Sequence, residues 1–248
     1  MDKIDFSIIF NSRDRVPMLT QMLECVRKTT NCIERIEVIV NFDDDDNNSL
    51  DAIDGLKKKF KFLKCLVNKR EKNIHTNVNK MAMMAEGRYI WALGDDCHIM
   101  THGWDRIALS KFHQSSFICP DNIMLGAVDS TSVDKVLQFG WYCDAPILTR
   151  EARDGLGYLI HPHYVSAGAD VATWIIYSSV GRILDLREIL FDHVTHNSIE
   201  ACNNKDKTQI EYLQRMDMAN FNPFTRDCSA EIEQIRNLID AKKNTNSL

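Results

Sequence analysis

Short apolar runs alternate with amphipathic stretches along the first hundred residues. The runs at 5–10, 35–42, 61–68 and 88–93 are continuous and bounded by polar residues, which is typical of buried strands. Helical patterns lie between them, one entered through Pro17 and the others spanning residues 49–60 and 76–86; the last carries Val78, Met81, Ala82 and Ala85 at i, i+3, i+4 and i+7. Four alternations of strand and helix predict an α/β fold with a largely parallel sheet covered by helices on both faces.

The second half of the chain is less regular. A loop at 100–112 leads into a helix, and strand-like runs follow at 123–130, 140–150 and 188–197. Short or amphipathic helices are expected at 150–158, 168–181 and 229–244. The chain becomes polar beyond residue 200 and contains no internal repeat. We therefore expect one domain over residues 1–200 and a polar, partly helical tail over 201–248 that packs on it or extends it.

Composition narrows the classes of protein that fit. Of 248 residues, 44% are hydrophobic and 26% charged, as in ordinary globular domains. The formal net charge of −5 argues against a nucleic-acid partner bound through its phosphates. No apolar run approaches the ~20 residues of a membrane span, and the charged start is unlike a signal peptide. The eight cysteines form no C-x-x-C pair, which favours reduced thiols and a cytoplasmic location.

Polar clusters follow three of the predicted strands, at residues 11–15 (NSRDR), 41–46 (NFDDDD) and 94–96 (GDD). In a parallel sheet these strand ends meet at one edge, which is where such sheets bind ligands. The adjacent carboxylates of Asp95 and Asp96 repel each other unless a cation lies beside them. Their hard oxygen ligands suit Mn²⁺ or Mg²⁺. The alternative interpretation of the same residues is an acidic loop that is exposed to solvent.

Three segments together resemble the glycosyltransferases of the GT-A fold, in particular the large inverting family 2 and its phage- and virus-type relatives. They are FSIIFNSRDR, VIVNFDDDDN and, most specifically, NKMAMMAEGRYIWALGDD; weaker similarity lies in PILTREARDGLGY, SAGADVATW and FDHVTH. The resemblance spans roughly residues 4–200. Two departures are G-D-D in place of the usual D-x-D, and G-A-D in place of an acidic E-D motif.

The resemblance implies a metal site and a catalytic base. Asp95 and Asp96 would hold Mn²⁺ or Mg²⁺ against the diphosphate of the donor, and His193 would complete the ligand set. His196 follows at i+3 and would join His193 only in a turned segment. Asp170 would take the proton from the acceptor hydroxyl, which inverts the anomeric centre. Helix capping is the alternative role for this residue.

The resemblance also implies a nucleoside site at the same edge. Asp43 and Asp45 would accept hydrogen bonds from uracil or ribose, with Asn11 and Arg13 beside the base. Arg70 would place a cation near the diphosphate. The simpler alternative is that the acidic run at 43–46 is solvated and that Arg70 is an exposed basic side chain. Arg13 and Arg15 fit a surface position equally well.

Other aromatic and histidine side chains are weaker candidates. Trp104, Trp141 and Tyr142 are possible platforms for a sugar ring, with burial in the core as the alternative. His98 and His102 form an H-x-x-x-H pair that a helical turn would bring together.

The expected function is transfer of a sugar, of the hexosyltransferase type, from a nucleotide-diphosphate sugar to a hydroxyl of a carbohydrate or glycan acceptor. Uridine is the expected base of the donor. A nucleotidyltransferase is disfavoured because its glycine-rich phosphate loop has no counterpart in NSRDRVP. A binding module of the same fold that takes carbohydrate or nucleotide without turnover stays open, because of the G-D-D and G-A-D departures.

Overall fold

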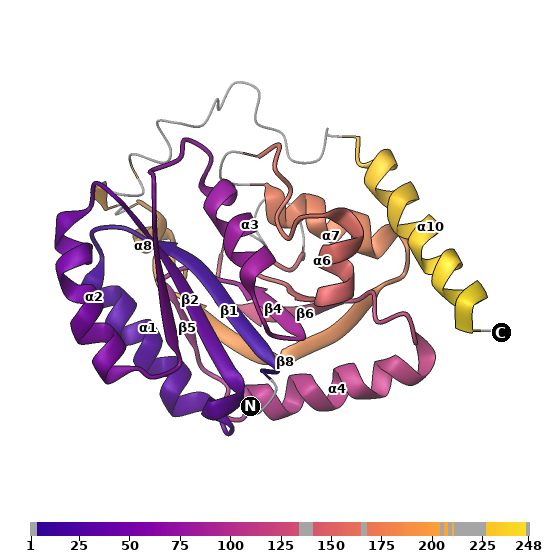
Figure 1. The fold of residues 1–248 in the computed structure, drawn as a ribbon, viewed down its shortest axis with the longest axis horizontal. Helices are drawn as coiled ribbons and strands as arrows, with labels where there is room; N and C mark the ends of the chain where they lie inside the picture. The colour runs from indigo at the N-terminus through magenta and orange to yellow at the C-terminus, as the bar shows by residue number, and fades with distance from the viewer. Residues whose placement is uncertain are drawn as a thin grey trace.

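A central sheet with helices on both sides organises the computed structural model, which describes residues 4–133, 141–164, 168–203, 206–207, 210 and 227–246. Within these residues the sheet has eight strands in the order β3-β2-β1-β4-β7-β6-β8-β5. The pairs β1–β2, β2–β3, β1–β4 and β6–β8 are parallel, whereas β4–β7, β6–β7 and β5–β8 are antiparallel. In Figure 1, α3, α6 and α7 lie on one side of the sheet and α1 and α4 on the other. The predicted α/β fold with a mostly parallel sheet is confirmed.

The first half is a run of right-handed strand–helix–strand units. Its elements are β1 (Phe6–Ser12), α1 (Val16–Thr29), β2 (Ile36–Asp43), α2 (Asn47–Lys59), β3 (Leu63–Asn68), α3 (Ile74–Met84) and β4 (Tyr89–Ala92). The strand order reverses at β1, which sends α3 to the opposite face from α1. The parallel register sets Asn11 opposite Asn41 and Asp43 opposite Asn68. The polar clusters after these strands therefore meet at one edge, as predicted.

The second half completes the sheet with shorter strands. Its elements are β5 (Cys97–Ile99), α4 (Trp104–Ile118), β6 (Leu125–Ser130), β7 (Ile147–Thr149), α6 (Arg150–Leu156), α7 (Ala169–Ser179), β8 (Ile183–His193), α8 (Ile199–Asn203) and α10 (Ser229–Asn246). Of the strand expected at 140–150, the described residues 141–150 form strand only at 147–149, and β8 begins earlier than the expected 188. Sequence patterns missed β5 altogether, because three residues are too few to show a period.

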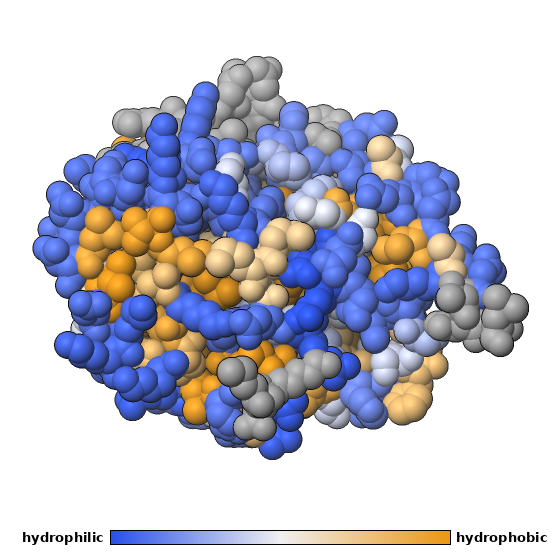
Figure 2. All heavy atoms as spheres, viewed as in Figure 1, coloured by the Kyte–Doolittle hydropathy of each residue, from blue (hydrophilic) through white to orange (hydrophobic). Residues whose placement is uncertain are grey.

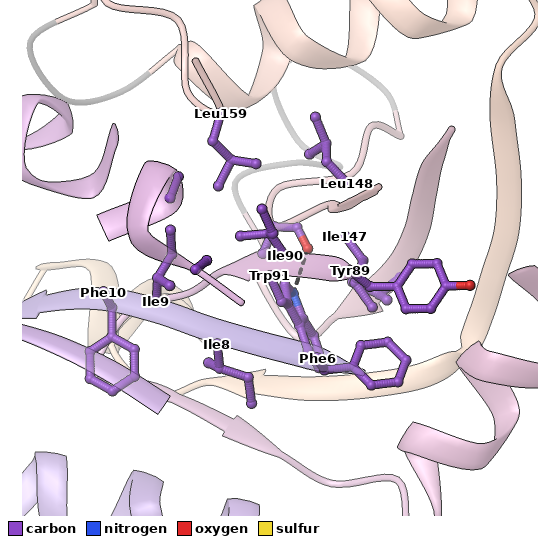
Figure 3. Close-up of a cluster of buried hydrophobic side chains, with 14 of the residues drawn as sticks. Phe6, Ile8, Ile9, Phe10, Tyr89, Ile90, Trp91, Ile147, Leu148 and Leu159 are labelled. Atoms are coloured by element: carbon purple, nitrogen blue, oxygen red, sulfur yellow. Dashed lines mark hydrogen bonds between the residues drawn. The ribbon is translucent and has the colours of Figure 1, made fainter. Parts of the chain in front are cut away.

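Aromatic side chains fill the core between β1, β4 and α4. Figure 3 shows Phe6 and Ile8 of β1 beside Trp91 of β4, whose Nε1 donates to the Ala145 carbonyl at 2.8 Å. The rings of Trp91 and Trp104 lie 5.2 Å apart, and Trp104 is 0% exposed. Trp104 therefore cannot be a sugar platform; burial of the large apolar indole in the core outweighed any surface role.

The C-terminal helix α10 packs on α6 and α7 (Figure 1). Ile235 and Ile239 are buried in this contact, and His161 Nε2 lies 2.8 Å from Glu231 Oε1. The division into a domain of residues 1–200 and a tail of 201–248 stays a prediction. Among the described residues, no helix combines the length and apolar character that a bilayer crossing requires. Figure 2, viewed from the same side as Figure 1, shows apolar residues in patches between polar ones.

Candidate active site

The acidic pair forms the turn between β4 and β5 and is buried. Asp95 is 4% exposed and Asp96 8% exposed. Asp95 accepts a hydrogen bond from Ser12 Oγ at 2.8 Å and another from Arg15 Nη1 at 3.1 Å. A solvated loop is therefore the wrong interpretation of these residues. Taking two adjacent carboxylates out of water is costly without positive charge beside them, and Arg15 supplies part of that charge.

Asp96 faces the end of β8. Its Oδ2 accepts a hydrogen bond from Thr195 Oγ1 at 2.5 Å and lies 3.8 Å from His193 Nε2. The antiparallel pairing of β5 with β8 sets Cys97 opposite His193, which brings the two segments together. Cys97 Sγ lies 3.8 Å from Asp96 Oδ1. The predicted association of Asp96 with His193 is thus present in the structure, across 97 positions of sequence.

Gly94 accounts for the G-D-D departure from D-x-D. A Cβ atom at position 94 would overlap Oδ1 of Asp96, and it would also approach Cys97 Sγ to 3.6 Å. A side chain at position 94 would therefore require the Asp96 carboxylate to move from the position it takes here. Glycine at this position is matched to a carboxylate that turns back toward β8.

The two carboxyl groups have opposite pKa shifts. Burial and the neighbouring Asp96 raise the pKa of Asp95 to about 6, although Arg15 and Ser12 oppose the rise. Burial also acts to raise the pKa of Asp96, but His193, Thr195 and Arg15 together hold it below the usual value. Asp96 therefore carries its charge at neutral pH, which suits it for a metal ligand.

The donor atoms around Asp96 fit a divalent cation. Asp96, Cys97 and His193 each place a possible ligand atom within 4.8 Å of the others. Burial raises the pKa of the Cys97 thiol well above its usual value, and a neutral thiol is a poor ligand for Mn²⁺ or Mg²⁺, so Asp96 and His193 are the residues that would hold such a cation. Behind them, Asp144 Oδ2 lies 3.9 Å from His193 Nδ1, which leaves Nε2 directed at Asp96. At 3.9 Å this is a contact between charges rather than a hydrogen bond, and Asp144 helps to raise the pKa of the His193 ring against the effect of burial. Asp144 and Thr195 were both missed from sequence.

Of the other candidate histidines, His196 lies beside His193, whereas His98 and His102 do not. The residues after His193 form a turn, so His196 Nδ1 comes within 3.1 Å of His193 Nε2. His98 lies on strand β5, where alternation points it away from the face of Cys97. His102 lies in the turn that follows and is exposed. No helical turn joins His98 to His102, so the structure does not bring this pair together.

The residues predicted to read the nucleoside form one cluster at the ends of β1, β2 and β3. Arg13 Nη1 lies 3.3 Å from Asp43 Oδ2 and is also hydrogen-bonded to Asp45. Arg70 approaches both carboxylates at 3.9 Å. Asn11 donates from Nδ2 to the Ile74 carbonyl at 2.8 Å. A pocket opens between these elements; it is lined by Asn11, Ser12, Arg13, Asp43, Glu71, Ile74 and Asn77.

The four aspartates at residues 43–46, where β2 ends, have different environments. Asp43 is partly buried, and burial raises its pKa, while Asp44 and Asp45 are exposed. Asp46 is buried at the N-cap of α2, where its carboxylate accepts from Ser49 N at 3.3 Å and from Asp14 N at 2.8 Å. Asp46 is therefore structural, whereas Asp43 and Asp45 pair with the guanidinium groups of Arg13 and Arg70.

Asp170 lies in the first turn of α7 but is not its N-cap. The N-cap is Gly168, whose φ of 91° favours glycine, and no side chain caps the helix there. Asp170 Oδ1 accepts from Val171 N at 2.9 Å. Burial, reinforced by the nearby charge of Asp144, raises the pKa of Asp170 to about 7. A carboxylate that titrates near neutrality matches the requirement for a general base.

Two tryptophans pack together near this helix. The rings of Trp141 and Trp174 meet edge to face, with centroids 5.1 Å apart, and both are partly exposed. Trp174 follows Asp170 by four residues and so lies on the same face of α7. Trp141 and the partly buried Tyr142 stay candidate platforms for a sugar.

Comparisons with known proteins identify the family and the fold. The family model "Glycosyl transferase family 2" matches residues 7–139. No curated protein matches the chain. The crystal structure of Staphylococcus aureus TarS 1-349 in complex with UDP-GlcNAc has 12% identity and a TM-score of 0.61, covering 89% of this chain and 69% of that one.

Two further solved structures have the same fold. A longer S. aureus TarS chain has 15% identity and a TM-score of 0.59, covering 86% of this chain; the present chain spans only 43% of its length. The mannosyltransferase PcManGT from Pyrobaculum calidifontis, in complex with GDP-Man and Mn²⁺, has 12% identity and a TM-score of 0.55, covering 99% of this chain and 77% of that one. From the family match and the shared fold, the chain belongs to glycosyl transferase family 2, the GT-A enzymes that transfer a sugar from a nucleotide sugar.

Proposed function

We propose that this protein is a metal-dependent, inverting glycosyltransferase that moves a hexose from a UDP-sugar to a hydroxyl of a carbohydrate or glycan. The observation that carries the proposal is the contact of Asp96 with His193, 3.8 Å apart beside the buried Asp95. This pair lies at the strand edge where the family binds its donor. Mn²⁺ or Mg²⁺ bound there would offset the charge that builds up on the leaving diphosphate.

Other residues at the same strand edge would bind the nucleoside and the diphosphate of the donor. Asp43 and Asp45 accept hydrogen bonds from the base or ribose of the donor, and Arg13 and Asn11 flank them. Arg70 adds positive charge near the diphosphate. PcManGT takes GDP-Man, whereas TarS takes UDP-GlcNAc, so relatives of this fold differ in the base they bind. Uridine is proposed here from the resemblance to family 2; the carboxylates of Asp43 and Asp45 would accept from the N3–H of uracil and from the ribose hydroxyls.

Asp170 acts on the acceptor. With a pKa near 7, its carboxylate takes the proton of the acceptor hydroxyl as that oxygen attacks the anomeric carbon from the face opposite the diphosphate. The nucleotide leaves from the other face, so the configuration inverts in one step. A single carboxylate base is sufficient for this geometry, since no covalent sugar–enzyme intermediate is formed.

Calorimetry with UDP and GDP, each with and without Mn²⁺, tests the proposal. We expect UDP to bind at least about tenfold more tightly than GDP and only weakly without Mn²⁺, a difference of about 1.4 kcal/mol or more. Turnover of UDP-sugars, followed as release of UDP, should then identify the donor. If neither nucleotide binds, the proposal is wrong. If UDP binds and no donor of a broad panel is consumed, the protein is a binding module.

A further inference from the structure

Arg15 is the cation that lies closest to the acidic pair. Arg15 is the N-cap residue of α1 and directly follows the loop after β1. Its side chain is only 10% exposed. Nη1 lies 3.1 Å from Asp95 Oδ1 and 4.0 Å from Asp96 Oδ2, while Nη2 lies 2.6 Å from Asp206 Oδ2. One guanidinium therefore serves three carboxylates that come from distant parts of the chain.

This arrangement differs from a structural ion pair. Arg182 and Asp121 form such a pair in the same protein, with one cation and one anion at 2.8 Å, both buried. Around Arg15 the negative charges outnumber the positive one, so the cluster keeps an excess of negative charge. The Nε atom of Arg15 is also buried with no hydrogen-bond acceptor among the described residues, which leaves a donor unused. Both features suit a residue that exchanges partners.

A divalent cation on Asp96 and His193 would lie close to the guanidinium of Arg15. Two positive groups at this separation repel strongly in a site that excludes water. An anion between them removes the repulsion. A diphosphate offers pairs of oxygens that a guanidinium can bind through two hydrogen bonds, and other oxygens of the same group can ligate a metal.

On the basis of the proposed function, we propose that Arg15 changes partners when the donor binds. In the donor-free protein it neutralises Asp95 and Asp96; when the nucleotide arrives with its metal, Arg15 moves onto the diphosphate and releases the carboxylates to the cation. The Asp206 contact yields in this exchange because that carboxylate is 40% exposed and returns to water. Arg15 thus lowers metal affinity in the empty site and raises nucleotide affinity in the loaded one.

Arg15→Ala tests the exchange, because the two affinities should change in opposite directions. Mn²⁺ binding without nucleotide is measured by the loss of the free-ion electron paramagnetic resonance signal, and UDP binding in saturating Mn²⁺ by calorimetry. We expect Mn²⁺ to bind about tenfold more tightly to the variant and UDP to bind about tenfold to a hundredfold more weakly. Arg15→Lys keeps the charge but not the fork, so Mn²⁺ affinity should stay near that of the wild type while UDP affinity falls severalfold.

Arg182→Lys is the matched control, since it disturbs a buried arginine–aspartate pair away from the acidic turn, and it should leave both affinities unchanged. Should Arg15→Ala weaken Mn²⁺ binding as well as UDP binding, Arg15 is a structural residue and the exchange does not occur. Unchanged UDP affinity in both Arg15 variants would also overturn the proposal, even if the wild type binds UDP as expected. A wild-type protein that binds no UDP with Mn²⁺ contradicts the proposed function itself, and the exchange with it.

Discussion

Replacing Asp170 with asparagine is expected to lower kcat by about 10²–10⁴-fold, the usual contribution of a general base, while UDP affinity in Mn²⁺ stays unchanged. Asparagine keeps the size of the side chain and can still accept the hydrogen bond from Val171 N, but it cannot take the acceptor proton. Initial rates of UDP release and calorimetric titration with UDP measure the two quantities. An asparagine variant that keeps wild-type kcat would remove Asp170 from the mechanism.

The pH dependence of the same pair of proteins adds an independent test. The pKa of Asp170 is about 7, so the base is protonated and inactive at lower pH. The kcat/KM of the wild type should therefore fall below about pH 7, since this ratio reports the free enzyme. The residual rate of Asp170→Asn should lack this limb. A wild-type profile that stays flat down to pH 5 contradicts the assignment of the base.

Stability should change in the opposite sense to activity. The folded-state pKa of Asp170, about 7, lies above the value of about 3.9 in an unfolded chain, so the charged form destabilises the fold. Stability contributed by this group is present at low pH and is lost as the pH rises toward and through 7. Since the side chain keeps some exposed surface, Asp170→Asn should gain about 2 kcal/mol at pH 8 and nothing near pH 3.5, as read from urea denaturation. An Asp170→Asn variant no more stable than the wild type at pH 8 would contradict the raised pKa of this group.

Replacing Asp96 with alanine is expected to weaken UDP binding in excess Mn²⁺ by about 100-fold, or about 3 kcal/mol. The change removes a charged ligand and leaves His193 and Thr195 without their carboxylate partner. UDP affinity without Mn²⁺ should hardly change, because the effect acts through the cation. Calorimetric titration with UDP, with and without Mn²⁺, shows whether the loss of affinity depends on the cation.

A surface carboxylate provides the control for this variant. Asp185 is 57% exposed and pairs with Arg187 away from the acidic turn, so Asp185→Ala should leave UDP affinity unchanged in either condition. If Asp96→Ala binds UDP in Mn²⁺ as tightly as the wild type, the carboxylate is not part of the metal site. Thermal denaturation of both variants checks that the fold is kept.

Much of the site's position followed from local patterns. Apolar runs that end in polar residues identify parallel strands, and parallel strands bring their ends to one edge, so the polar clusters at 11–15 and 41–46 were expected to meet and do. The same reasoning set Asp95 and Asp96 at that edge. These predictions need only the strand order and the direction of each strand. The choice of individual residues within these clusters, and the place of Arg70 beside them, came from the resemblance to the family.

The parts that were missed depend on contacts between distant segments. Thr195 lies 99 positions from Asp96, and Asp144 lies in a segment that was expected to be strand but is loop in the structure. Arg15 looked like a surface residue because nothing near it in sequence reports that its side chain folds under the acidic turn. Burial of this kind is set by tertiary packing, which composition and periodicity do not encode.

The central claim is that Asp96 and His193 hold a cation against the diphosphate of the donor. Crystals grown with MnCl₂ and UDP, measured at the manganese absorption edge, test it directly. We predict an anomalous peak about 2.0–2.6 Å from a carboxylate oxygen of Asp96, with the imidazole of His193 and the diphosphate oxygens beside it. UDP bound with no peak at the acidic turn, or a peak held only by residues elsewhere, would contradict the claim.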